Sequence, residues 1–307
     1  MDVGSNTLRL LIARAGPGPK LATVCLERAI TRLSQNLAPG RPLHGPARDR
    51  SLKVLVRFGE TIARHGVGQV FGGATAAVRL ASDGDHFLDL VARQSGLKLK
   101  KLDGQEEARL TALGLASGLP DGRGPVLAID PGGQSTEFIP IEAGQPRPGL
   151  SLNLGVVALT EKVMVSNPPQ AGQMTGLKAE IKKKLEEVTA FYPPRKGLTL
   201  AGTAGTVTTI AAMILEMTDY DPATITGLNI GLSDLKRLVS RLEKMSLEER
   251  RRLPGLETGR EDVILPGLVL VQSLLEVYSL TKIVAIDSGL LEGFIIDGLG
   301  LAQDRPE

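Results

Sequence analysis

The chain has 307 residues, enough for two domains with separate hydrophobic cores. Its net charge of +2 gives no global argument for binding nucleic acid or a membrane surface, and its single cysteine, Cys25, excludes an intrachain disulfide framework. One cysteine and three scattered histidines cannot build a zinc site, and no apolar run approaches the length of a membrane-spanning helix. We expect a cytoplasmic protein with neither nucleic-acid nor membrane partners.

The first half of the chain reads as alternating strands and helices. Residues 2–14 have the pattern strand, glycine turn, strand, and the β-branched residues within 21–33 predict that the chain stays extended there. Apolar residues at helical spacing predict a helix over 47–65. The segments that follow are predicted as a strand at 69–72, a helix beginning within 74–80, an amphipathic helix at 85–94, a strand at 97–102 and a helix at 105–117.

The second half repeats this scheme. Prolines and glycines between residues 119 and 125 mark the predicted boundary, which gives domains of 1–121 and 122–307. Strands are predicted at 126–130, 135–141, 149–153, 198–201 and 282–287, and helices at 156–163, 177–191, 207–217, 235–244 and 261–278. A closing helix at about 292–307 is expected to pack back on the first domain. Strands and helices in both halves predict the α/β class with mixed sheets.

The pattern Asp-x-Gly opens both halves. Asp2 begins the sequence Asp-Val-Gly-Ser-Asn-Thr, and Asp130 begins Asp-Pro-Gly-Gly-Gln-Ser-Thr about 128 positions later. Each copy leads into an apolar stretch, so each reads as a tight turn before a strand. Glycine lets backbone N–H groups approach an anion closely, and carboxylates beside phosphate suit Mg²⁺. The repeat predicts two related halves that face each other across a phosphate-binding cleft, with Asp2 and Asp130 near the metal.

The two copies differ in what precedes them. Four apolar residues, 126–129, come before Asp130, whereas only Met1 comes before Asp2. Either the first strand is cut short or its start lies upstream of Met1. In both cases we expect Asp2 to be held less firmly than Asp130.

Three further elements could contribute to a phosphate site. Residues 202–206, Gly-Thr-Ala-Gly-Thr, join a strand to a helix, and the free amides and dipole of such a junction bind anions. Arg79 follows a strand among small residues, where its guanidinium could clamp a phosphoryl group. Glu106 and Glu107 begin a helix, and at most one can face the cleft because neighbouring helical residues point about 100° apart. Each pattern alone also fits an ordinary structural role.

Six elements in this order resemble the exopolyphosphatase / guanosine pentaphosphate phosphohydrolase family. They are residues 2–10, 75–79, 104–110, 130–137, 201–206 and 260–264, and together they span essentially the whole chain. The resemblance implies an actin-like, ribonuclease H-like fold of two halves with the active site in the interdomain cleft. It also implies hydrolytic release of the terminal phosphate from polyphosphate or pppGpp, with Mg²⁺. The chain is similar to the short, two-domain form of the family.

By position, the resemblance assigns catalytic roles to Glu107, Arg79 and Asp130. Glu107 would orient and deprotonate the attacking water, Arg79 would clamp phosphate, and Asp130 would bind metal and support catalysis. Glu137 joins Asp2 and Asp130 as a predicted metal ligand. The phosphate cradle is predicted to comprise Gly4, Ser5, Asn6, Thr7, Gly132, Gly133, Gln134, Ser135, Gly202, Thr203 and Ala204.

Three positions depart from the family pattern. Gln134 stands where the family usually has a third glycine, and a non-glycine there would cost roughly 1–2 kcal/mol if the position required a positive φ. Pro131 removes one N–H donor from the turn. Leu291 stands where an arginine is common. These departures bear on rate and substrate choice more than on fold.

The predicted function is Mg²⁺-dependent hydrolysis of the terminal phosphoanhydride of inorganic polyphosphate. Only 3% of residues are aromatic and none is tryptophan, so a stacked guanine has few partners, which favours polyphosphate over pppGpp. Hydrolysis of pppGpp to ppGpp is the alternative. A kinase or ATPase on the same fold, and a non-catalytic sensor of polyphosphate or pppGpp, remain open, as does a homodimer.

Overall fold

The structure, a computed structural model, describes residues 1–16, 21–119, 124–143 and 145–301. The chain divides into two compact units, Met1–Ser117 with Gly289–Glu307, and Gly118–Ser288. The predicted boundary between residues 121 and 122 lies outside the described residues. The chain returns to the first unit at Gly289, so the second unit ends earlier than the predicted domain 122–307. Helix α12 (Leu290–Gly298) is the part of the expected closing helix that is described, and residues 302–307 lie outside.

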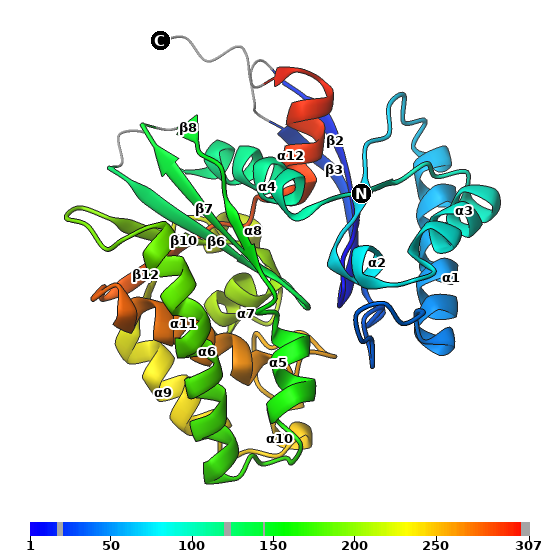
Figure 1. Cartoon of the computed structure of the whole chain (residues 1–307). Helices are drawn as coiled ribbons and strands as arrows, with labels where there is room; N and C mark the ends of the chain where they lie inside the picture. Colours follow the sequence, from blue (N-terminus) through cyan, green and yellow to red (C-terminus); the bar gives the residue numbers. More distant parts are fainter. Residues whose placement is uncertain (17–20, 120–123, 144, 302–307) are drawn as a thin grey trace. The chain divides into compact units, whose positions relative to one another are not determined.

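The sheet of the first unit has a central strand with one antiparallel neighbour and one parallel neighbour. Its order is β3 (Leu21–Ile30), β2 (Thr7–Ala15), β1 (Asp2–Val3), β4 (Gly73–Ala74) and β5 (Lys100–Lys101). β1 is antiparallel to β2 and parallel to β4, and β4 is parallel to β5. The accompanying helices are α1 (Gly45–Arg64), α2 (Ala76–Leu80), α3 (Gly84–Ser95), α4 (Gly104–Gly118) and α12. Figure 1 shows α1 and α12 on opposite faces of this sheet.

The sheet of the second unit is larger. Its order is β11 (Asn229–Gly231), β12 (Lys282–Ala285), β10 (Thr199–Gly202), β6 (Val126–Pro131), β7 (Thr136–Glu142) and β8 (Gln145–Pro146), and β9 (Leu150–Leu152) also pairs with β7. Its helices are α5 (Val156–Val163), α6 (Ala171–Phe191), α7 (Ala204–Ile214), α8 (Pro222–Ile225), α9 (Leu232–Leu242), α10 (Leu247–Arg251) and α11 (Ile264–Val277). Almost every residue of α11 is buried, which makes it the central helix of this core.

The two sheets repeat one topology. In each, the strand that carries the Asp-x-Gly motif is antiparallel to the next strand and parallel to a later one, which has a further parallel neighbour. Strands β6, β7, β10 and β12 therefore hold the places of β1, β2, β4 and β5. The predicted α/β class, with mixed sheets flanked by helices, is confirmed.

Local sequence explains why the helices of the first unit bury the faces they do. Leu55, Phe58 and Ile62 recur at intervals of three and four along α1, which places them on one stripe facing the core. Gly96 ends α3 with a φ of 73°, a conformation that glycine adopts without the steric penalty of a side chain. No helix in the described part of the chain is long and apolar enough to cross a membrane.

Two predicted strands of the first unit are much shorter than expected. The strand predicted at 69–72 is found only at Gly73–Ala74, and the strand predicted at 97–102 only at Lys100–Lys101. A strand needs a neighbour to complete its hydrogen-bond ladder, and β1, which pairs with β4, has only the residues Asp2 and Val3. The short central strand therefore limits β4, which pairs with it, and through β4 it limits β5, whereas β2 is extended by its pairing with β3.

Candidate active site

The two Asp-x-Gly turns have the same geometry. In each, the residue seven positions after the aspartate lies directly opposite it on the returning strand, giving the pairs Asp2–Arg9 and Asp130–Glu137. A Cβ added to Gly4 would lie 2.7 Å from the carbonyl oxygen of Thr7, and one added to the equivalent Gly132 would lie 3.0 Å from that of Ser135. The backbone thus approaches itself at the same place in both turns, so that a side chain would overlap the carbonyl oxygen in the first turn and crowd it in the second.

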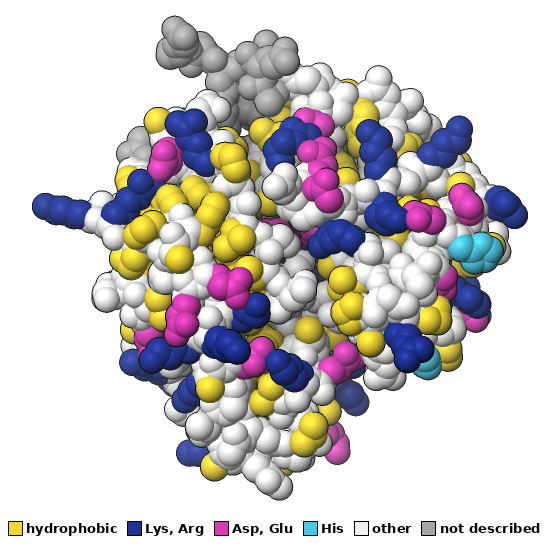
Figure 2. All heavy atoms as spheres, in the orientation of Figure 1, with side chains coloured by type: hydrophobic (Ala, Val, Ile, Leu, Met, Phe, Trp, Pro, Cys, Tyr) yellow, Lys and Arg dark blue, Asp and Glu magenta, His cyan; other side chains and the backbone are white. Residues whose placement is uncertain are grey.

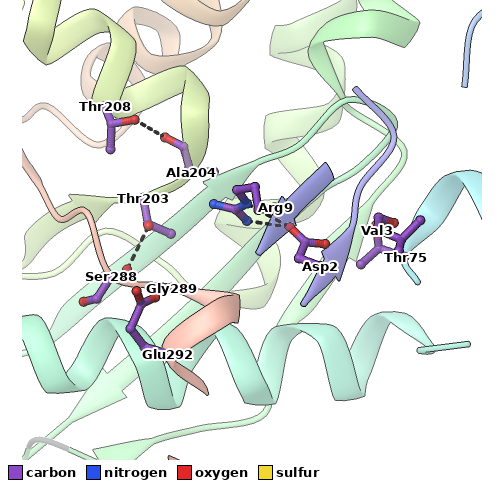
Figure 3. Close-up of polar contacts among 10 residues, drawn as sticks. All are labelled: Asp2, Val3, Arg9, Thr75, Thr203, Ala204, Thr208, Ser288, Gly289 and Glu292. Carbon is purple, nitrogen blue, oxygen red and sulfur yellow. Dashed lines mark hydrogen bonds and ion pairs between the residues drawn. The ribbon is translucent and has the colours of Figure 1, made fainter. Parts of the chain in front are cut away.

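In the first turn the aspartate is neutralised by an arginine. Nε and Nη2 of Arg9 donate to Oδ2 of the buried Asp2 at 2.9 and 2.7 Å (Figure 3). A carboxylate–guanidinium pair of this kind is a strong, charge-assisted contact. Oδ1 of Asp2 is also buried and has no hydrogen-bond partner among the described residues. This turn therefore combines a nearly balanced ion pair with one oxygen still able to accept a hydrogen bond or a metal.

In the second turn two carboxylates take the corresponding places. Asp130 is 7% exposed and Glu137 is 1% exposed, and residues paired directly across antiparallel strands point to the same face. The hydroxyl of Ser151 donates to Oε1 of Glu137 at 2.8 Å. Two buried like charges at neighbouring positions repel each other, and a divalent cation with oxygen ligands relieves that repulsion. The donor set at this position fits Mg²⁺.

The carboxylate pair would need further ligands from outside the protein. Among the described residues of either unit, no group of three or more histidine, cysteine, aspartate or glutamate side chains could hold a metal. Mg²⁺ commonly binds through one or two carboxylates together with phosphate oxygens and water. The pair is thus suited to a metal that arrives with a phosphate, and the predicted participation of Asp2 stays a prediction.

The second turn directs a row of amides away from α5. The carbonyl oxygens of Gly132, Gly133 and Gln134 accept hydrogen bonds from the backbone at the start of α5. Because a trans peptide places its N–H opposite its C=O, the amides of Gly133, Gln134 and Ser135 point away from α5. Gln134 is not in the left-handed region, so the strain expected of a non-glycine does not arise. Its side-chain Nε2 is buried without a partner among the described residues, which adds one possible donor.

The third predicted phosphate element lies against the second. The hydroxyl of Thr206 donates to the carbonyl oxygen of Pro131 at 2.9 Å, and the amide of Thr203 donates to that of Ile129 at 2.9 Å. The Thr203 hydroxyl donates to the Ser288 carbonyl oxygen at 2.8 Å (Figure 3). These bonds place the amino end of α7, a site of positive potential, next to the 132–135 turn. Ala204 begins α7 with a φ of 61°, where a non-glycine residue is strained.

The predicted catalytic glutamate and phosphate-binding arginine are paired. Nη1 of Arg79 donates to Oε2 of Glu107 at 2.9 Å and to the carbonyl oxygen of Leu102 at 2.9 Å. Glu107 is buried in the first turn of α4, whereas Glu106 is exposed and forms an ion pair with Arg109 at 2.7 Å. The Arg109 hydrogen bond lowers the pKa of Glu106. Helical geometry thus separates the two acids, and Glu107 is the inward one.

The helix that carries Arg79 is anchored to the first turn. The amide of Thr75, the residue before α2, donates to the carbonyl oxygen of Val3 in β1 at 3.1 Å, and Figure 3 shows the two residues side by side. The Arg79 amide in turn donates to Thr75 at 3.0 Å. Within the first unit, the Asp2 turn and the Arg79 helix are therefore fixed to one another through β1.

Two arginines at these turns received no role from the sequence. Arg9 stands seven residues after Asp2, as Glu137 stands seven after Asp130, and comparison of the two copies would have indicated it. Arg260 is buried, its Nε donates to Glu257 at 2.6 Å, and its guanidinium fills the space beside Gly205 so closely that any side chain there would overlap it. Only the family resemblance pointed to this segment. Leu291, the departure from a common arginine, is buried in α12.

Surface charge is mixed on one face of the molecule. On the face drawn in Figure 2, lysine and arginine side chains alternate with aspartate and glutamate. Many form exposed ion pairs, such as Arg109 with Asp297 at 2.7 Å. Exposed pairs of this kind contribute little to stability.

Comparison with known proteins identifies the family. The chain matches the Ppx/GppA phosphatase family over residues 11–302 and belongs to it. It is 30% identical to exopolyphosphatase 2 of Mycobacterium tuberculosis, over 98% of this chain and 97% of that protein. It is 30% identical to the solved Ppx/GppA enzyme of Aquifex aeolicus, with a TM-score of 0.80 over 96% of this chain and 97% of that one. An exopolyphosphatase from Cytophaga hutchinsonii, 24% identical over 97% and 96%, shares the fold with a TM-score of 0.89. The predicted family and enzyme class, a phosphoanhydride hydrolase, are confirmed.

Proposed function

We propose that the protein hydrolyses the terminal phosphoanhydride of inorganic polyphosphate and releases phosphate, with Mg²⁺. The observation that carries the proposal is the cluster in the second unit, where the 132–135 amides, the amino end of α7 and a buried carboxylate pair adjoin one another. Amides and a helix end bind phosphate oxygens, and paired carboxylates bind the metal that accompanies them. Relatives named exopolyphosphatase favour the same substrate class.

The residues take separate roles in this proposal. Asp130 and Glu137 would hold Mg²⁺, which, when bound, supplies positive charge to the phosphate oxygens. The turn amides and Arg79 would neutralise the remaining charge, since phosphoryl transfer depends mainly on positioning and electrostatics. Glu107 would accept the proton of the attacking water. Because Arg79 is bonded to Glu107 in this structure, a phosphate that draws Arg79 away would leave the carboxylate of Glu107 better able to take that water.

A matched pair of glutamate variants tests the role of Glu107. We expect Glu107→Gln to lower kcat at least about 100-fold, the usual contribution of a general base, with polyphosphate binding retained. Glu106→Gln changes the neighbouring acid, which is exposed and paired with Arg109, and should stay within a few-fold of the parent. Equal turnover in the two variants, measured as phosphate release from long-chain polyphosphate, would remove Glu107 from the mechanism.

The choice of substrate requires a direct comparison. The scarcity of aromatic side chains leaves few partners for a guanine base and favours polyphosphate. Phosphate release should be measured side by side from long-chain polyphosphate and from pppGpp. Faster release from pppGpp would reverse the assignment, tight binding of either without release would indicate a sensor, and ATP turnover that depends on an acceptor would indicate a kinase. A cytoplasmic location and a homodimer remain predictions.

A further inference from the structure

A serine hydroxyl completes a row of polar side chains across the second sheet. Asp130 on β6 lies directly opposite Glu137 on β7, and Glu137 lies directly opposite Ser151 on β9. Because a strand residue pairs with only one residue on each edge, β6 and β9 lie on opposite edges of β7. Directly paired residues point to the same face of a sheet. Ser151 therefore stands on the far side of Glu137 from Asp130.

The contact between Ser151 and Glu137 is a hydrogen bond to a carboxylate oxygen. The Ser151 hydroxyl donates to Oε1 of Glu137 at 2.8 Å. Glu137 is 1% exposed, so little water can compete for this bond. The last torsion of a glutamate side chain has no sharply preferred value, so a donor held at a fixed place sets the plane of the carboxylate. Bonds to an ionised acceptor are also roughly twice as strong as bonds between neutral groups.

The sequence of β9 fixes the direction in which Ser151 points. Its three residues alternate Leu-Ser-Leu, and Leu150 and Leu152 both pack against the core of the second unit. Alternation places Ser151 on the other face of the strand. A slip of one residue would turn both leucines away from the core, so the apolar pattern specifies the register that brings Ser151 opposite Glu137.

The chain after β9 is bonded to the turn that carries the phosphate-binding amides of our proposal. The hydroxyl of Thr136 donates to the carbonyl oxygen of Leu154 at 2.6 Å, and the amide of Gly155 donates to that of Gln134 at 3.1 Å. A Cβ added to Gly155 would lie 2.2–2.3 Å from backbone atoms of the turn, so this segment packs directly against it. The strand that carries Ser151 is thus fixed to the turn between the two predicted metal ligands.

The first unit has a different residue at the corresponding place. There β3 holds the position of β9, and Arg28 lies directly opposite Arg9. The shared topology therefore does not require a serine at this position. A hydroxyl donor is present in the unit in which the facing residue is a carboxylate.

We propose that Ser151 is a positioning residue, which orients the Glu137 carboxylate so that it can bind Mg²⁺ together with Asp130. This inference deepens the proposed function and rests on its assignment of Glu137 to the metal. Changing a group that holds a metal ligand typically costs about 10–100-fold in metal affinity. The role requires no contact between Ser151 and the metal.

Mg²⁺ binding by matched variants tests this role. Inorganic phosphate, the reaction product, is present throughout, because it supplies phosphate oxygens without turnover. We expect calorimetry to show that Ser151→Ala weakens Mg²⁺ binding about 10-fold or more, whereas Ser151→Thr, which keeps the hydroxyl on a strand-forming residue, stays within about 3-fold. Ser151→Cys, whose thiol is a weak donor of similar size, repeats the test should the alanine variant not fold.

Thr61→Val is the matched control. It removes the 2.9 Å hydrogen bond from the Thr61 hydroxyl to Oε1 of Glu27, which is a bond of the same kind in the first unit. We expect its Mg²⁺ affinity to equal that of the parent. On long-chain polyphosphate, Ser151→Ala should raise the Mg²⁺ concentration for half-maximal rate by the factor found in calorimetry, with kcat at saturating Mg²⁺ within a few-fold of the parent.

Unchanged Mg²⁺ affinity in Ser151→Ala would overturn the proposal. An equal loss in Ser151→Ala and Thr61→Val would also overturn it, since the loss would then reflect a general loosening of the fold. A parent chain that binds no Mg²⁺ beside phosphate would overturn both this inference and the metal assignment. A parent chain that binds Mg²⁺ but releases no phosphate from polyphosphate or pppGpp would contradict the hydrolase function, and the calorimetric comparison would still decide the role of Ser151.

Discussion

The buried amino terminus gives the first unit an unusual dependence of stability on pH. The Met1 ammonium loses solvation on burial, and this outweighs the favourable charge of nearby Asp2, so its pKa falls from 8.0 to about 5 in the folded chain. Between these values the unfolded chain binds a proton that the folded chain does not. Protonation therefore favours unfolding, and the free energy of unfolding rises as pH increases from about 5 to 8.

The size of the effect follows from the two pKa values. A gap from 8.0 to about 5 corresponds to about 4 kcal/mol over the whole window. The same linkage leaves a penalty of about 3 kcal/mol at pH 6 and about 1 kcal/mol at pH 7. Such values are a substantial part of the ~5–15 kcal/mol that stabilises an ordinary domain.

A variant that carries Met-Ser-Gly-Ser ahead of Met1 is the matched control. The Met1 nitrogen donates to the Phe71 carbonyl oxygen at 2.6 Å, and the polar extension moves the charged amine away from this position without adding a run of apolar side chains. Urea unfolding of both chains between pH 5 and 8 gives the difference in unfolding free energy at each pH. This difference cancels the histidines and carboxylates that the chains share. A difference in unfolding free energy that stays constant between pH 5 and 8 would refute the reasoning. A difference that becomes smaller as the pH falls would mean that burial raises the pKa of the amine instead of lowering it.

Two further predictions concern the second unit. Ala204→Gly should raise the free energy of unfolding by about 0.5–1 kcal/mol, because glycine accepts the left-handed φ at this position. Ala179→Gly, on the exposed face of α6, should lower the free energy of unfolding by about 1 kcal/mol, and thermal unfolding of the two variants measures these opposite changes. Mg²⁺ at ten times its Kd should stabilise the parent chain by about 1.4 kcal/mol and the Glu137→Gln variant by clearly less. Without Mg²⁺, the variant should be the more stable of the two. Equal stabilisation of both chains by Mg²⁺ in calorimetry would show that Glu137 does not bind the metal.

The sequence predicted the fold class and the turn positions because both depend on local patterns. Gly4 and Gly132 mark turns in which the backbone leaves little room for a side chain, and the apolar runs beside them mark strands. Strand length in the first unit could not be predicted locally, because residues 69–72 need a neighbour that the short β1 does not provide. The partners of site residues were equally inaccessible. The contact between Arg79 and Glu107 joins residues 28 positions apart, and only the folded chain brings Arg260 against Gly205.

The repeated turn also explains how one backbone design can serve two chemical purposes. The residue opposite the aspartate is at the same place in both units, so its identity alone changes the charge of the site. Arg9 makes the first turn a neutral pair, in which Asp2 is held by a guanidinium. Glu137 places a second carboxyl group beside Asp130, and carboxylate oxygens are ligands that a divalent cation such as Mg²⁺ prefers. If Asp130 and Glu137 bind the metal as we propose, the two halves differ in metal binding because the residue opposite the aspartate differs in charge. The backbone of the turn is the same in both halves.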